Sequence, residues 1–120
     1  MKGVVDEAQR ALINVSVAAI EGGELEAVTV WIDTAFNGGL VIPRRQIEQL
    51  GLAQASTTQA VLADGQVVDL ETFTCHIEWF GQIHRIQVVA NDGDFPLLGT
   101  MLLADRKPLI DYRSKSVVLE

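Results

Sequence analysis

The sequence predicts a mainly β domain, an antiparallel sandwich or a small barrel, with one or two short helices. Glycine-containing turn signals recur at short intervals, as at Asn37-Gly38-Gly39, Asp64-Gly65 and Phe80-Gly81. Between the turns lie runs rich in β-branched residues, at 12–20, 25–32, 57–62, 66–79, 82–90 and 115–120. Short alternating strands separated by turns at this spacing are typical of small all-β folds.

One helix is predicted at Pro43–Leu50. Proline suits a first helical position, and Ile47 and Leu50 are three residues apart and so share one face. Gly51 follows where a helix of this length would end. The segment that begins at Thr100 indicates a second, shorter helix.

The turn at Phe80-Gly81 requires a choice of register between its flanking strands. A three-residue loop would pair Phe73 with Gln87 and Cys75 with Arg85. A two-residue loop pairs Phe73 with Val88, Cys75 with Ile86, and Ile77 with His84. Because directly opposed residues share a face, the second register gathers apolar side chains on one side and is preferred.

This register argues against metal binding and thiol chemistry. His76 and His84 would point to opposite faces of the hairpin, so one ion could not bind both. Cys75 would lie on the apolar face, where a buried thiol is usually inert. We therefore expect no metal site and no cofactor. Trp31, Trp79 and Phe80 are expected to contribute to core or hairpin packing.

Composition limits the function further. The 120 residues, 48% of them hydrophobic, suit a single domain over 1–120, with 1–11 as a loosely packed N-terminal extension. The net charge is −7 and no stretch is basic, the best cluster being Arg44-Arg45, which disfavours nucleic acid as a partner. No apolar run is long enough to span a membrane, and charged residues interrupt the N-terminus where a signal peptide needs apolar ones. With one cysteine, the chain is expected to be cytoplasmic.

Asp33 stands out because it ends the apolar run VTVWI and is followed at once by a polar turn. Two interpretations are open. Aspartate often caps a turn at the end of a strand, and position alone favours that interpretation. The alternative is that the carboxylate takes part in a reaction.

The residues that follow Asp33 form an ordered series of motifs. They are Asp33-Thr34-Ala35-Phe36-Asn37-Gly38, Val41-Ile42-Pro43, Leu50-Gly51-Leu52, Leu62-Ala63-Asp64-Gly65 and Leu97-Leu98-Gly99. In order and approximate spacing, over about residues 12–119, this series resembles the aspartic proteases of the retropepsin type. It is most similar to their small bacterial and archaeal single-domain branch.

The resemblance implies a closed small β-barrel that works as a cytoplasmic homodimer on a peptide or protein substrate, with no cofactor. Asp33 would be the catalytic aspartate, and Thr34 would hydrogen-bond across the dimer. A flap and substrate-binding region would comprise Phe36, Leu62, Ala63, Asp64, Gly65 and Gln66. Support for the catalytic loop would come from Leu97, Leu98 and Gly99.

Ala35 is the main departure, since the family normally has glycine at this position of the catalytic triplet. A methyl group there could narrow the cleft or strain the loop. A second hypothesis follows: a catalytically weak or inactive dimeric β-module of the same ancestry that binds peptides by strand addition. The segment 115–120 is the expected sheet edge for such binding.

Overall fold

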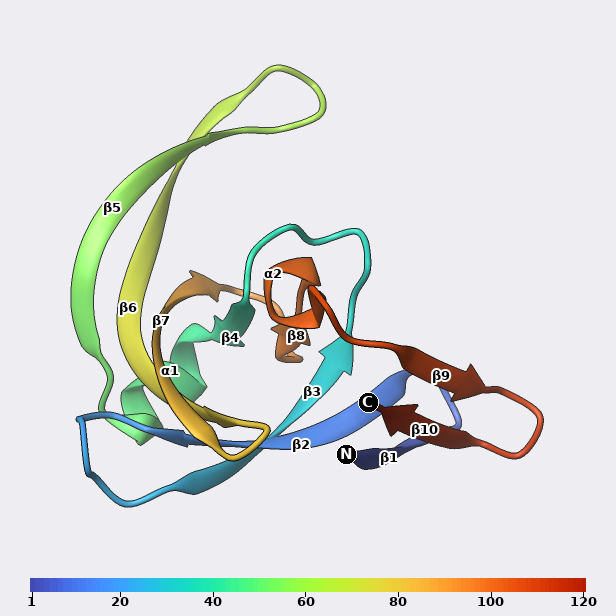
Figure 1. Cartoon of the computed structure of the whole chain (residues 1–120). Helices are drawn as coiled ribbons and strands as arrows, with labels where there is room; N and C mark the ends of the chain where they lie inside the picture. Colours follow the sequence, from blue (N-terminus) through green and yellow to red (C-terminus); the bar gives the residue numbers. More distant parts are fainter.

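The computed structural model of the chain describes residues 1–120, except for the side chain of Thr58. Ten strands and two short helices follow one another along these residues (Figure 1). The strands are β1 (Lys2–Val5), β2 (Ala11–Ala18), β3 (Glu26–Ile32), β4 (Leu40–Pro43), β5 (Ala53–Val61), β6 (Val67–Trp79), β7 (Gln82–Asn91), β8 (Leu97–Leu98), β9 (Pro108–Asp111) and β10 (Ser116–Leu119). The helices are α1 (Arg44–Leu50) and α2 (Thr100–Leu103). The prediction of a mainly β fold with one or two short helices is confirmed.

All the strands belong to one sheet in the order β5-β6-β7-β4-β8-β3-β2-β1-β10-β9, and β2 also pairs with β6. The additional pairing joins β6, β7, β4, β8, β3 and β2 into a hydrogen-bonded ring. Four strands lie outside this ring, and Figure 1 shows the β5–β6 and β9–β10 hairpins projecting from it in different directions. The prediction of a closed small barrel is therefore met only in part.

The core is built by alternation of buried and exposed side chains along the strands. In β3, Val28, Val30 and Ile32 are buried, whereas the residues between them are exposed. Strand β2 shows the same pattern, with Ile13 and Val15 among its buried positions. Burying each side chain of this size contributes about 1.5–3 kcal/mol to folding. Because Ile32 points inward, Trp31 before it must point outward.

The long β6–β7 hairpin has the predicted two-residue register. Phe73 pairs with Val88, Cys75 with Ile86 and Ile77 with His84. Cys75 is fully buried, and burial raises the pKa of its thiol to about 11. The thiol is therefore protonated at neutral pH, as expected for an inert core cysteine.

Helix α1 begins one residue later than predicted, because Pro43 is still extended and serves as the N-cap. Gly51 ends the helix in the left-handed conformation, with φ of 72°, and its N–H donates to the carbonyls of Ile47 and Glu48. Arg44, in the first turn, donates from Nη1 to Oε2 of Glu71 at 2.7 Å. Both side chains are partly exposed, so solvent screens this ion pair.

The two chain termini differ from expectation. Residues 1–11 were expected to pack loosely, but β1 pairs with both β2 and β10. The segment 115–120 was expected to offer a free edge, and this is wrong, because β10 lies between β1 and β9. The outer strands of the sheet are β5 and β9. Among the described residues, neither helix is long and apolar enough to cross a membrane.

Candidate active site

Asp33 lies directly after β3, at the start of the loop that leads to β4. Its N–H donates to the carbonyl of Leu98 at 2.9 Å, which continues the pairing of β3 with β8 beyond the strand. Its side-chain Oδ1 accepts the N–H of Ala35 at 2.9 Å. Its carbonyl also accepts the N–H of Phe36, at 3.3 Å. Asp33 thus caps its own turn while keeping a partly exposed carboxylate.

Strand β8 holds both ends of this loop. It runs parallel to β3, with Leu98 beside Ile32, and antiparallel to β4, with Leu98 beside Leu40. The N–H of Gly99 then donates to the carbonyl of Gly39 at 2.8 Å. The two strands that flank the loop are therefore fixed by one central strand, and Leu97, Leu98 and Gly99 lie where they can support it.

The loop rests on the start of α2 through an unusually close approach at Gly99. A Cβ atom on Gly99 would overlap the carbonyl oxygen of Gly38 and lie 2.6 Å from that of Phe36. The first amides of α2 use the same carbonyls: Thr100 donates to Phe36 at 2.8 Å, and Met101 to Gly38 at 3.2 Å. Residue 99 must be glycine for the loop to be seated in this way.

Ala35 adopts an ordinary backbone conformation. The described non-glycine residues with positive φ are Gln9, Phe80, Asp105 and Lys115, so Ala35 is not among them. The side chain is exposed. The sequence raised two possible effects of alanine at this position, a strained loop and a narrowed cleft. The backbone conformation excludes the first, so the space that the methyl group takes up in the cleft is the remaining effect.

A cavity of about 340 Å³ opens beside Asp33, lined by Trp31, Ile32, Asp33, Thr34 and Leu97. Trp31 was expected to contribute to core or hairpin packing, and the core part of this prediction is wrong, because Trp31 is 37% exposed. The signal for its position was present in the sequence, because period-two alternation in VTVWI makes Trp31 an outward residue if Ile32 is buried. Trp79, in contrast, is buried and packs edge-to-face against Phe80, as expected for core and hairpin aromatics.

Sequence reasoning also missed Arg10, which lies near this cavity. Its guanidinium carbon is 4.2 Å from the ring centroid of Phe95 and 5.9 Å from that of Trp31. Asp6 fixes the side chain, accepting from Arg10 Nε at 2.7 Å. Stacking of a cation on both rings restrains the Trp31 wall of the cavity. A lone arginine before a strand gave no sequence pattern that could have revealed this contact.

The predicted flap residues form the tip of the β5–β6 hairpin. Leu62 donates its N–H to the carbonyl of Gln66 at 2.8 Å, and Gly65 has φ of 86°. Asp64 Oδ1 accepts the N–H of Gln66, which closes the turn. Figure 1 shows the hairpin arching on the side of the β3–β4 loop. None of the residues lining the Asp33 cavity comes from this hairpin, so the structure brings the carboxylate together with β8 but not with the flap.

A single partly exposed carboxylate can accept a proton from water, but it cannot also supply a proton to a carbonyl. Among the described residues, no three His, Cys, Asp or Glu side chains gather closely enough to hold a metal ion.

Comparison with solved structures identifies the architecture. A retropepsin-like aspartic protease from Rickettsia conorii superimposes with a TM-score of 0.65, covering 99% of this chain and 88% of that one at 16% identity. The EIAV protease complexed with the inhibitor HBY-793 gives a TM-score of 0.56, covering 83% and 90% at 17% identity. The fold is retropepsin-like. No family model matches the sequence, and no curated protein matches it either. At these identities, the retropepsin-like likeness concerns the fold alone.

Proposed function

We propose that the chain is an aspartic endopeptidase that acts as a homodimer, with one Asp33 from each subunit. The observation that carries the proposal is the seating of Asp33: a partly exposed carboxylate fixed between β3, β8 and Gly99, beside a cavity lined by Trp31 and Leu97. This arrangement occurs in a retropepsin-like fold. The two solved structures that share this fold are proteases, which favours peptide hydrolysis as the reaction.

The reaction needs two carboxylates that share one proton. One takes a proton from a water molecule, and the other, protonated, polarises the carbonyl of the peptide bond. Like charges a few ångströms apart cannot both ionise, so such a pair titrates in two separated steps. A two-fold axis that passes close to Asp33 supplies the second carboxylate from an identical loop.

The neighbouring residues then take defined roles. Exposed Thr34 braces the loop of the second subunit through its hydroxyl. Phe36 and the hairpin tip (Leu62, Ala63, Asp64, Gly65 and Gln66) cover the substrate and exclude water. Leu97, Leu98 and Gly99 hold the catalytic loop from beneath.

Replacing Asp33 with asparagine tests the assignment. Asparagine keeps an oxygen that can accept the Ala35 N–H, so the turn and the fold should persist. Cleavage of a fluorogenic peptide library, measured from acid to neutral pH, should fall to background because no carboxylate remains to activate water.

Two controls accompany this measurement. Circular dichroism and sedimentation velocity should match those of the wild-type chain. Asp64→Asn, a change at another turn-capping aspartate, should retain measurable cleavage. Undiminished cleavage by Asp33→Asn would refute the assignment.

A catalytically weak or inactive dimeric β-module remains the second candidate. The hydrogen bond from Ala35 N–H to Asp33 Oδ1 favours it, because a turn-capping aspartate explains that contact without any reaction. Strand addition would have to use β9 or β5, the outer strands, since β10 is internal. A wild-type chain that binds extended peptides without cleaving them at any pH would support the module over the enzyme.

A further inference from the structure

We propose that a groove between the β6–β7 hairpin and α2 binds an acidic segment of a partner peptide or protein. The groove holds about 440 Å³. We call it the α2 groove and define it by an apolar floor and a charged rim: Trp79, Ile86, Met101, Arg85, Asp105 and Arg106. Neither Asp33 nor the tip of the β5–β6 hairpin lines it. The inference therefore goes beyond the proposed function, because the occupant is bound at a site that has no part in cleavage.

The floor of the α2 groove offers contact to an apolar side chain. Cys75, Ile77 and Trp79 alternate along β6 and share a face, and Ile86, opposite Cys75, joins them. Met101 projects from α2 and is 53% exposed. An unbranched, flexible methionine adapts to side chains of different shape. Apolar walls of this kind, with a few polar groups at the rim, are typical of binding sites.

Arg106 is held at the rim by the turn that follows α2. Asp105 adopts φ of 63°, and the N–H of Arg106 donates to the carbonyl of Leu103 at 2.9 Å, so the chain reverses after the helix. The guanidinium carbon of Arg106 then lies 3.6 Å from the ring centroid of Phe80. A cation stacked on a ring is attracted to its face, while its N–H groups stay available at the edge of the guanidinium plane.

Phe80 is an unusual residue for the position it occupies. Phe80 and Gly81 form the two-residue turn of the β6–β7 hairpin, with φ of 50° and 82°. Such a turn favours asparagine, aspartate or glycine at its first position, and positive φ strains a bulky residue. The Phe80 ring packs edge-to-face against Trp79 and supports Arg106. Local strain that orients one side chain is often found at binding sites.

Charge indicates an acidic occupant. The sequence has 16 acidic residues and 9 lysines and arginines, yet two arginines and a single carboxylate line the α2 groove: Arg85, Arg106 and Asp105. Within the described part of the chain, neither arginine forms an ion pair. A guanidinium group matches a carboxylate through two parallel hydrogen bonds. A glutamate or aspartate of the partner would supply the carboxylate that these arginines lack.

A nucleic acid fits the α2 groove poorly. The net charge of −7 repels a chain of phosphates, and binding of single strands also depends on exposed rings that stack on the bases. The Phe80 ring is covered by Arg106, and Trp79 is buried.

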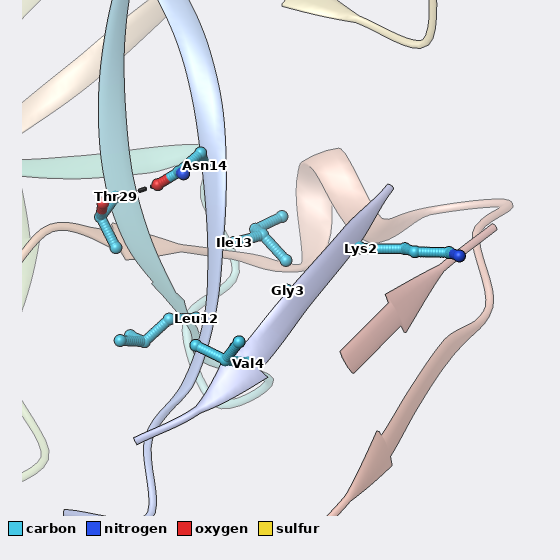
Figure 2. A pocket seen from close by; sticks show the side chains of 7 residues that line it. All are labelled: Lys2, Gly3, Val4, Leu12, Ile13, Asn14 and Thr29. Carbon is cyan, nitrogen blue, oxygen red and sulfur yellow. Dashed lines mark hydrogen bonds between the residues drawn. The ribbon is translucent and has the colours of Figure 1, made fainter. Parts of the chain in front are cut away.

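The hollow between β1 and β2 shows by contrast what distinguishes the α2 groove (Figure 2). It is of similar size, about 450 Å³, and Val4 and Leu12 are among its apolar residues. Its polar groups do not converge. Thr29 donates its hydroxyl to Asn14 at 2.6 Å, and Figure 2 shows Lys2 pointing away from both. That hollow therefore indicates no particular ligand.

Fluorescence anisotropy tests the inference, with an Asp33→Asn chain as the parent so that the probes stay intact. The probes are labelled octapeptides in which two glutamates flank leucine, phenylalanine, valine or methionine, and a matched panel with glutamines instead. The acidic panel should bind about tenfold more tightly, the usual effect of one hydrogen-bonded charge pair. Arg106→Gln should abolish this difference, and Phe80→Asn should reduce it, because asparagine suits the turn but offers no ring to Arg106.

The matched control is Arg113→Gln. It removes the same charge from an exposed arginine that lies outside the α2 groove, in the turn between β9 and β10. This variant should bind the acidic panel as the parent does. Circular dichroism should show that all the variants keep the parent fold.

Several results would refute the α2 groove. One is an acidic panel that binds no more tightly than the glutamine panel, and another is unchanged binding by Arg106→Gln. Equal weakening by Arg113→Gln would mean that net charge alone explains the binding. Self-association or binding of single-stranded DNA that Arg106→Gln abolishes, with no peptide bound, would assign the groove to another occupant. None of these measurements depends on cleavage, so a failure of the proposed function would be seen separately.

Discussion

One hydrogen bond joins Asp33 and Ala35. The effect of the Ala35 methyl group depends on the space that the loop leaves beside the Asp33 carboxylate. The Ala35 N–H supports the carboxylate, while its methyl group is exposed beside it. Because the backbone of Ala35 is unstrained, a smaller side chain would relieve no strain. Any effect of removing the methyl group must therefore come from the space next to the carboxylate.

We predict that Ala35→Gly increases kcat/KM for peptide cleavage by about fivefold. This factor corresponds to about 1 kcal/mol, the usual effect of a single methyl group in a binding site. The hydrogen bond to Asp33 uses the main chain and is preserved. The extra freedom of glycine should lower the free energy of unfolding by no more than about 1 kcal/mol. Steady-state kinetics and urea unfolding measure the two effects, and Ala35→Val should change kcat/KM in the opposite direction. Slower cleavage by Ala35→Gly would contradict the argument.

Single residues also show which features could be predicted from the sequence and which could not. The order of motifs around Asp33 was enough to propose it as a catalytic residue, and that role stays a prediction. Trp31 was misassigned because its type suggested core packing, although its position in the alternation indicated an outward side chain. Arg10 could not be found, since its contacts with Phe95 and Trp31 join segments far apart in the chain.

At the scale of elements, strands with a clear alternation were predictable, including the short strand β10, whereas β8 and β1 were not. Alternation and the Phe80-Gly81 turn were enough to predict the β6–β7 register. Strand β8 has only two residues, too few for any period, and its pairing with β3 and β4 is visible only in three dimensions. Strand β1 was missed for a similar reason, because glycine at position 3 weakens its pattern.

The contact between β8, α2 and the β3–β4 loop predicts a large effect of Gly99→Ala. The added methyl group would overlap the carbonyl of Gly38, and backbone atoms cannot move aside as a flexible side chain can. We expect the free energy of unfolding to fall by about 1–3 kcal/mol, the usual cost of overpacking. Cleavage should fall further than stability alone explains, because Asp33 is held by the same strand.

Gly93→Ala is the matched control, since it precedes β8 but is exposed and meets only the side chain of Asn91. It should leave both unfolding and cleavage close to wild type. Thermal melts and kinetics on the two variants separate a specific effect at Gly99 from a general effect of adding a methyl group. Equal behaviour of both variants would show that the loop does not depend on the close approach.

At the scale of the whole molecule, the chain combines a net charge of −7 with a loop that presents the single partly exposed carboxylate of Asp33. The sequence contains a single Asp-Thr-small motif, so the proposed two-carboxylate mechanism requires a second copy of the chain.

A shared site predicts a specific result when subunits are mixed. If each active site needs Asp33 from both chains, a heterodimer of wild type and Asp33→Asn is inactive. After subunit exchange, activity per wild-type chain should fall to about half at equal amounts of the two chains, and to about one tenth with a ninefold excess of the variant. Activity that stays proportional to the wild-type concentration at every ratio would mean that one chain suffices, and the two-carboxylate mechanism would then be wrong.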